Sequence, residues 1–320
     1  MKPLRYVLLG AAGYIAPRHL DAIRNTGGTL VAAADPHDSV GVLDTHFPAA
    51  AFFTGPDCDE QLFKAVALGD LGKVDRAVVC SPNDLHVVQT ISAVNLGCDV
   101  ICEKPLALTS SGLDEIVKAQ ARMDKSVWTV VQLRHLPRIM DLKPRWARTT
   151  GKHRVSLTYI TSRGPWYASS WKGDQARSGG PLLNLGIHFL DLLTWCFGPA
   201  VSTRVDYLTG LRGRGTLTLE RAEVDWFLSS DPQDLPLTAW ELGDTAYRRM
   251  TVDDHEVDLN PNFVAGTHTT VYGSINTGNG FGAGDVRLGI EAAQMILNAA
   301  KEGATVQSQR SRTASGAGAR

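Results

Sequence analysis

The stretch that decides the fold stands near the start of the chain: Arg5-Tyr6-Val7-Leu8-Leu9-Gly10-Ala11-Ala12-Gly13-Tyr14-Ile15-Ala16. An apolar run that leads directly into a turn of glycine and alanine predicts a buried parallel strand, and the residues that follow, 15–25, have helical spacing. Small residues in such a turn let the backbone approach a pyrophosphate, whose charge then lies at the N-terminus of the next helix. We therefore predict a dinucleotide-binding turn with cofactor contacts from Gly10, Ala12, Gly13, Tyr14 and Ile15.

The alternation of apolar runs and helical patterns continues to about residue 150. Helical spacing is found at 85–96 and 113–122, between short runs rich in Val, Ile and Leu. Strands of this composition that alternate with helices form a parallel sheet covered on both faces. We expect strands at 4–9, 30–34, 51–53, 74–80, 100–102 and 127–131.

After residue 150 the pattern changes to segments with period two. Such segments at 153–161, 217–219 and 224–228 predict an antiparallel sheet with one solvated face, and helices are expected at 182–197 and 286–301. The fold class is therefore α/β: an N-terminal Rossmann domain with a doubly wound parallel sheet, then a C-terminal α+β domain with a large open, mainly antiparallel sheet. We predict the first domain at 1–133, a substrate-binding and oligomerisation domain at 134–307, and a disordered tail at 308–320.

Length and composition are those of an ordinary globular protein. The chain has 320 residues, of which 43% are hydrophobic and 20% charged, with a net charge of −1, which suits two domains and offers no electrostatic case for nucleic acid or a membrane surface. No apolar run is long enough to span a membrane, and the N-terminal one is too short for a signal peptide, so we expect a cytoplasmic protein. The five scattered cysteines are interpreted as buried free thiols rather than metal ligands.

The second predicted strand is followed by Asp35, at the interval where a carboxylate accepts hydrogen bonds from the ribose hydroxyls of adenosine. A carboxylate repels a 2′-phosphate, and Pro36-His37-Asp38 offers no arginine to bind one, so NAD is favoured over NADP. The turn after the fourth strand contains Ser81 and Asn83, and His86 follows it. These residues cap the next helix or contact the nicotinamide half of the cofactor, and both interpretations can hold together.

A lysine follows the fifth predicted strand, in Glu103-Lys104-Pro105. The carboxyl ends of the strands line the ligand crevice of a doubly wound sheet, so Lys104 belongs either to a solvated rim or to the catalytic apparatus. Hydride transfer from a secondary alcohol to NAD needs a base for the hydroxyl proton and a cation beside the developing alkoxide. Lys104 would supply the cation.

The predicted helix 182–197 carries three polar residues, Asn184, His188 and Asp191, spaced i, i+4 and i+7. On an α-helix they would project from one face, where they need partners. His188 is then either a core histidine satisfied by Asp191 or the base of a hydride transfer. Zinc is disfavoured because no second histidine or cysteine stands at ligand spacing.

The segment Thr161-Ser162-Arg163-Gly164-Pro165-Trp166-Tyr167, followed by Trp171-Lys172, is rich in aromatic and cationic residues and is expected to form a loop. Dense aromatic residues indicate stacking or an interface, and arginine suits recognition of a carboxylate or phosphate. Either a sugar nucleotide or a subunit contact fits this composition.

Taken together, four motifs resemble those of the Gfo/Idh/MocA oxidoreductases: the glycine turn with His19, the 81–83 turn with His86, Glu103-Lys104-Pro105, and Gly186-Ile187-His188-Phe189-Leu190-Asp191. The family fold, an N-terminal Rossmann domain and a C-terminal α/β domain with an open, largely antiparallel sheet, agrees with the two patterns above. The resemblance implies that Lys104 and His188 are catalytic. It also implies dimers or tetramers formed through the open sheet face, hence a homo-oligomer.

A narrower resemblance, to the WlbA/WbpB branch of this family, lies in residues 10–19, 102–106, 132–135, 159–174 and 268–272. It implies NAD-dependent oxidation of the 3-hydroxyl of UDP-N-acetyl-D-glucosaminuronic acid to a 3-keto sugar, in bacterial surface polysaccharide (O-antigen) biosynthesis. In some members 2-oxoglutarate reoxidises the NADH. Asn184 stands where many members of the wider family carry aspartate; it cannot act as an acid or base, so His188 would rely on Asp191 or on substrate.

The alternatives to a sugar-nucleotide dehydrogenase are an enzyme that acts on a free sugar or cyclitol, and a non-catalytic NAD-binding regulator. The resemblance also implies the remaining site residues. Further cofactor contacts are expected from Glu103, Lys104, Gln132, Trp171 and Lys172, supporting roles from Asn184 and Asp191, and substrate contacts from Arg18, Lys104, Tyr159, Arg163, Asn184, His188 and Tyr272.

Overall fold

The computed structural model describes residues 2–38, 41–259 and 266–316, with side chains up to residue 303. The chain divides into two compact units. The first contains Met1–Ile139, Ala176–Gly179 and Pro261–Arg287, and the second contains Met140–Gln175, Gly180–Asn260 and Leu288–Arg320. A segment that follows most of the second unit in sequence therefore returns to the first.

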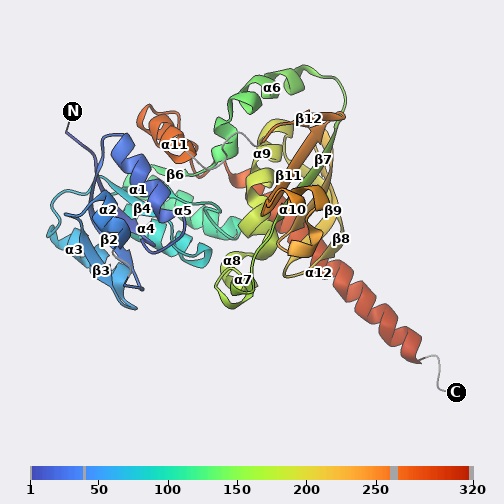
Figure 1. Cartoon of the computed structure of the whole chain (residues 1–320), viewed down its shortest axis with the longest axis horizontal. Helices are drawn as coiled ribbons and strands as arrows, with labels where there is room; N and C mark the ends of the chain where they lie inside the picture. The colour runs from blue at the N-terminus through green and yellow to red at the C-terminus, as the bar shows by residue number, and fades with distance from the viewer. Residues whose placement is uncertain (1, 39–40, 260–265, 317–320) are drawn as a thin grey trace. The chain divides into compact units, whose positions relative to one another are not determined.

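The first unit contains a six-stranded sheet, whose strands are drawn in blue to green in Figure 1. The order of the strands is β3-β2-β1-β4-β5-β6. All of its strand pairs are parallel, as the Val/Ile/Leu-rich runs predict. The order reverses between β1 and β4, which is the point where sheets of this kind bind ligands at the carboxyl ends of their strands. Every predicted strand is confirmed, with ends shifted by at most two residues: β1 (Arg5–Leu9), β2 (Thr29–Asp35), β3 (Ala51–Thr54), β4 (Arg76–Val79), β5 (Asp99–Cys102) and β6 (Val127–Thr129).

The helices of the first unit include one from the returning segment. Val271, Tyr272 and Ile275 of α11 (Thr267–Asn276) are buried in the same apolar core as the strands and α1. Burial of this helix removes apolar surface from water that the Rossmann sheet would otherwise leave exposed. The helices are α1 (Ala16–Asn25), α2 (Gly41–His46), α3 (Cys58–Leu68), α4 (His86–Asn95), α5 (Ser110–Met123), α11, and the 3₁₀ turns η1 (Asn83–Leu85) and η2 (Gln132–His135).

The second unit contains a six-stranded sheet in the order β12-β11-β7-β10-β9-β8. It is mainly antiparallel, as predicted, but β7 and β10 pair in parallel, which the long connection between them allows. Side chains alternate between buried and exposed along β7, β9 and β10, which confirms the period-two pattern. The strands are β7 (His153–Thr161), β8 (Ala200–Leu208), β9 (Arg212–Leu219), β10 (Ala222–Ser229), β11 (Ala246–Val252) and β12 (His255–Val257).

Two long helical segments of this unit pack against each other, and the first of them also packs against the sheet. The first joins a π-helix (Leu182–Gly186) to α9 (Ile187–Phe197), and the second, α12, is Arg287–Gly316. A Cβ at Gly186 would lie 2.5 Å from the side chain of Leu228, and one at Gly289 would lie 2.9 Å from Cα of Asp191. The segment 182–197 is therefore packed closely against both β10 and α12.

Several elements differ from the sequence-based expectations or were not foreseen. The segment 161–172 is not all loop, because α7 (Trp166–Ser169) forms there. Helix α12 runs into the predicted tail, whose last residues, 317–320, lie outside the described part of the chain. No helix in the described ranges is both long and apolar enough to cross a membrane. The elements not foreseen also include α6 (Pro137–Arg148), α8 (Gln175–Ser178), η4 (Pro232–Asp234) and α10 (Leu237–Glu241).

Candidate active site

Close approach of the backbone shapes the glycine turn between β1 and α1. Gly10 has a φ of +92°, and a Cβ there would lie 2.6 Å from the backbone N of Ser81, so only glycine fits. The backbone N–H of Ala12 donates to Oδ2 of Asp35 at 2.9 Å, and that of His37 donates to Oδ1 at 2.9 Å. The ring Nδ1 of His37 also lies 3.2 Å from Oδ1. The carboxylate of Asp35 is thereby fixed beside the turn, at the position where it can accept from a ribose hydroxyl.

The turn after β4 uses its side chains to order neighbouring segments of the first unit. Ser81 Oγ donates to Oε1 of Gln89 at 2.6 Å, and Asn83 Nδ2 donates to the backbone O of Ser178 at 2.9 Å. Asn83 begins η1 directly before α4, which agrees with its predicted place at the start of a helix. The turn therefore holds both α4 and the short segment 176–179.

His86, predicted to contact the cofactor, lies fully buried between two backbone carbonyls. Its Nδ1 is 2.7 Å from the carbonyl O of Pro105, and its Nε2 is 3.0 Å from that of Ser81. The ring thus connects the turn after β4 with the turn after β5. Burial lowers the pKa of His86 below 6.5, although the two carbonyls favour the protonated ring.

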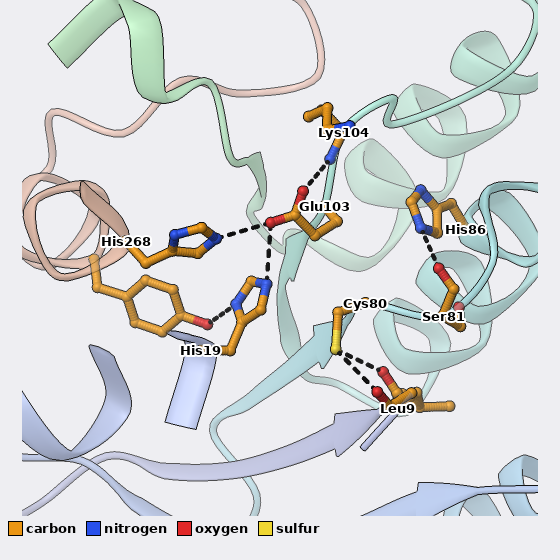
Figure 2. A network of polar contacts seen from close by, with 10 residues as sticks. Leu9, His19, Cys80, Ser81, His86, Glu103, Lys104 and His268 are labelled. Atoms are coloured by element: carbon orange, nitrogen blue, oxygen red, sulfur yellow. Dashed lines mark hydrogen bonds and ion pairs between the residues drawn. The ribbon is translucent and has the colours of Figure 1, made fainter. Parts of the chain in front are cut away.

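Glu103 is the centre of a buried hydrogen-bond network at the end of β5 (Figure 2). Its Oε1 accepts from His19 Nε2 at 3.2 Å and from His268 Nε2 at 2.9 Å, and its Oε2 accepts from the backbone N–H of Lys104 at 3.1 Å. Nδ1 of His19 lies 2.8 Å from the hydroxyl of Tyr272. Tyr272, which the resemblance assigns to the substrate, is therefore fully buried inside this network.

The network stabilises a negative charge in the interior of the first unit. Burial alone would raise the pKa of Glu103, but the hydrogen bonds and charges of His19 and His268 outweigh it and hold that pKa well below 4.5. Burial lowers the pKa of His19 below 6.5. At neutral pH the carboxylate is consequently charged and the His19 ring is neutral.

In the second unit the predicted polar stripe is interrupted by a change of helix type. Asn184 lies in the π-helix Leu182–Gly186, whereas His188 and Asp191 lie in α9. In a π-helix the backbone hydrogen bonds run between residues i and i+5, so Asn184 belongs to a wider turn than His188 and Asp191 do. Asn184 Nδ2 donates to the hydroxyl of Tyr167 at 2.8 Å. His188 is partly exposed between buried neighbours, and Asp191 is buried.

A lysine of the second unit lies among aromatic rings. Lys172 Nζ is 5.5 Å from the ring centre of Trp166 and 5.2 Å from that of Trp171. Burial, and then the positive charge of Arg163, lower the pKa of Lys172. The charge of Arg163 therefore acts at Lys172, and the arrangement favours an anion nearby.

Arg248 adds a third cation to this part of the second unit. Its guanidinium carbon lies 5.2 Å from the ring centre of Tyr159, its partner across the β7–β11 pair. Sequence reasoning missed Arg248 because β11 was not predicted, so no signal placed this arginine beside Tyr159.

Comparison with known proteins identifies this combination of units. Residues 4–130 match the NAD-binding Rossmann fold of the Gfo/Idh/MocA oxidoreductase family, and residues 152–227 match its C-terminal α/β domain. The crystal structure of the WlbA (WbpB) dehydrogenase from Thermus thermophilus in complex with NAD and alpha-ketoglutarate is 42% identical, with a TM-score of 0.86 over 92% of this chain and 94% of that chain. The chain belongs to the Gfo/Idh/MocA oxidoreductase family.

A second structure of the same dehydrogenase and one curated relative bear on the assignment within the Gfo/Idh/MocA family. The same Thermus thermophilus dehydrogenase, in complex with NAD and UDP-GlcNAcA, is similar at 42% identity, with a TM-score of 0.85 over 92% of this chain and 94% of that chain. D-glucoside 3-dehydrogenase of Escherichia coli (strain K12) is 30% identical over 145 residues, which are 41% of this chain and 38% of that protein. This chain thus spans about two-fifths of the curated relative. The predicted family and fold are confirmed.

The remaining predicted contacts of this Gfo/Idh/MocA member lie around the first unit. Tyr14 is exposed, and Arg18 Nη2 donates to its hydroxyl at 3.0 Å. Gln132 is buried in η2, and within the described ranges its Oε1 has no hydrogen-bond partner. A buried amide oxygen of this kind suits contact with a bound molecule, so the cofactor role of Gln132 stays a prediction.

Acid should destabilise the first unit because His19 and His86 are kept neutral by burial. The pKa values of both are lowered from 6.5, so the unfolded chain takes up protons near pH 6.5 while the folded chain does not. Stability is then fully present above that pH and is lost as the pH falls toward the lowered pKa values. We expect the free energy of unfolding, measured in urea by circular dichroism, to fall by up to about 1.4 kcal/mol per pH unit for each histidine.

Two variants separate these histidines from general acid effects. His19→Gln should reduce the pH slope by about half, since one of the two proton-binding sites of the unfolded chain is gone. His255→Gln, at an exposed position of β12, should leave the slope unchanged. A free energy of unfolding that stays constant from about pH 7.5 to 5.5 would contradict this account of the buried rings.

Proposed function

We propose that this protein is an NAD-dependent dehydrogenase that oxidises the 3-hydroxyl of UDP-N-acetylglucosaminuronic acid to the 3-keto sugar. The proposal is supported by the 42% identity with a structure that contains NAD and UDP-GlcNAcA. It also agrees with a first unit whose glycine turn and Asp35 carboxylate suit the pyrophosphate and ribose of NAD.

The observation that carries the substrate class is the cationic and aromatic group in the second unit. Arg163, Lys172 and Arg248 lie among Trp and Tyr rings, and the charge of Arg163 acts directly on Lys172. A free sugar or cyclitol carries no negative charge to which these cations could be attracted. A UDP-uronic acid carries a diphosphate and a carboxylate, both of which arginine binds in bidentate fashion.

The catalytic roles are assigned to Lys104 and His188. NAD, when bound, supplies the acceptor for the hydride that leaves C3. The ammonium group of Lys104 stabilises negative charge on the 3-oxygen, and His188 accepts the hydroxyl proton. Asn184 cannot exchange a proton in this step, and its side chain orients Tyr167 through the 2.8 Å hydrogen bond.

We further propose that 2-oxoglutarate reoxidises the NADH and that the product feeds surface polysaccharide (O-antigen) biosynthesis. The reoxidation balances: NADH and a proton reduce the keto group of 2-oxoglutarate to the hydroxyl of 2-hydroxyglutarate. Its two carboxylates suit the same cations as the uronic acid does. Homo-oligomerisation and a cytoplasmic location stay predictions.

The test is turnover by the purified protein as isolated, with its bound cofactor. Incubation with UDP-N-acetylglucosaminuronic acid and 2-oxoglutarate should yield the 3-keto sugar and 2-hydroxyglutarate in equal amounts, detected by mass spectrometry. Omission of 2-oxoglutarate should leave at most one 3-keto sugar per enzyme. Turnover of myo-inositol or glucose, with none of the UDP-sugar, would instead favour the free-cyclitol or free-sugar alternative.

A further inference from the structure

The dipeptide Lys104-Pro105 leaves the sheet but is held at both ends by buried side chains. The backbone N–H of Glu103 still donates to Val79 O at 2.8 Å, so Lys104 is the first residue beyond the β4–β5 ladder. Its N–H donates to Glu103 Oε2 at 3.1 Å, and the carbonyl O of Pro105 lies 2.7 Å from His86 Nδ1. At the proposed catalytic lysine, hydrogen bonds to the side chains of Glu103 and His86 thus take the place of the hydrogen bonds between β4 and β5. Figure 2 shows both side chains.

The two oxygens of Glu103 have different partners, and this fixes the protons of the network. Oε1 faces Nε2 of His19 and Nε2 of His268, and a carboxylate can only accept, so both Nε2 atoms carry the proton. A neutral His19 then accepts at Nδ1 from the hydroxyl of Tyr272, 2.8 Å away. Oε2 is left for the N–H of Lys104.

A buried charge at this position lowers the stability of the fold by about several kcal/mol unless it is fully hydrogen-bonded. An apolar side chain at the same position would pack without this loss of stability. What an apolar side chain cannot do is accept the N–H of Lys104. His19 and His268 come from α1 and α11, so they hold the carboxylate from two helices of the unit.

We propose that Glu103 is a positioning residue, whose carboxylate, held by His19 and His268, fixes the backbone of Lys104 and thereby directs its ammonium group. The inference rests on the proposed catalytic role of Lys104. It also explains why the lysine follows a glutamate. The side chain of Glu103 accepts the backbone N–H of Lys104, which has left the sheet.

The first experiment compares Glu103→Gln with Glu103→Asp and with Asp75→Asn. The amide of glutamine cannot accept from both histidines and from Lys104 N–H, so kcat should fall by about 10- to 100-fold while the KM for UDP-N-acetylglucosaminuronic acid changes by less than about threefold. Glu103→Asp keeps the charge and should recover part of kcat. Asp75 also accepts a backbone N–H, that of Arg5 at 3.0 Å, so Asp75→Asn is a matched control that should leave kcat unchanged.

The second experiment does not depend on activity. Hydrogen exchange of the Lys104 amide should be accelerated by at least about tenfold in Glu103→Gln and unchanged in Asp75→Asn. Nitrogen NMR of the wild type at neutral pH should show a proton on Nε2 of both His19 and His268, and a neutral ring for His19. Unchanged exchange at Lys104, or full activity of Glu103→Gln where Lys104→Met is inactive, would overturn the positioning role but leave the proposed function standing.

Metal binding by the same three side chains is a further outcome of the test. His19, Glu103 and His268 could together hold a metal ion, because histidine nitrogen and carboxylate oxygen are common ligands. Stoichiometric metal in the purified wild type, lost in Glu103→Gln, would overturn the hydrogen-bonded arrangement. Failure of the wild type to oxidise the UDP-sugar would refute the proposed function, while hydrogen exchange and NMR would still decide the role of Glu103.

Discussion

Lys104→Met should abolish most of the oxidation of UDP-N-acetylglucosaminuronic acid, with kcat reduced by about 100- to 1000-fold, while NAD remains bound. Methionine keeps the apolar stem but has no ammonium group to stabilise the 3-oxygen, and loss of one such charge-stabilising group costs about 100- to 1000-fold or more. The backbone N–H of Lys104, which donates to Glu103, is retained, so the turn after β5 should keep its conformation. Single-turnover kinetics and calorimetric titration with NAD measure the two effects.

Lys118→Met is the matched control for this substitution. Lys118 lies on the exposed side of α5 in the same unit, where its Nζ pairs with Glu115 at 2.9 Å. An exposed pair of this kind contributes little to stability, so the control should retain wild-type activity. Substantial activity of Lys104→Met would refute the assigned role, and loss of NAD binding would make Lys104 a cofactor contact instead.

The Rossmann sheet is predictable from local sequence, whereas the edges of the second sheet are not. Strands such as β1 and β4 are buried on both faces, so their apolar runs are continuous. Strand β8 has almost no buried residue on either face, and period two therefore gives no signal there. β11 and β12 are short or irregular in the same way.

The candidate site was predictable where topology determines it and not where distant segments meet. Asp35 and Lys104 lie at the carboxyl ends of β2 and β5, which the alternation of strands and helices predicts. The contact of Glu103 with His268 joins residues 165 positions apart, and no local pattern shows that α11 returns to the first unit. For the same reason the sequence does not show that Tyr272, which is predicted to contact the substrate, is buried in the core.

The second large effect is expected from His188→Gln, which should lower kcat/KM by about 100- to 10,000-fold, the usual contribution of a general base. His188 lies in the first turn of α9, directly after the π-helix, and is partly exposed among buried neighbours. Glutamine preserves a polar group of similar reach but cannot take up a proton. A histidine base makes kcat/KM fall at acid pH, and this fall should be absent in the variant. A pH profile of kcat/KM measures the difference.

His255→Gln is the control, because it removes an exposed histidine of the same unit and should change neither the rate nor the pH profile. A core histidine satisfied by Asp191, the other interpretation of the polar stripe, predicts a different pair of results. In that case His188→Gln would lower the melting temperature, and the surviving folded enzyme would keep the wild-type pH profile. A lowered rate together with a flattened acid limb and an unchanged melting temperature separates the base from the core residue, since only proton transfer connects the imidazole to the pH dependence of turnover.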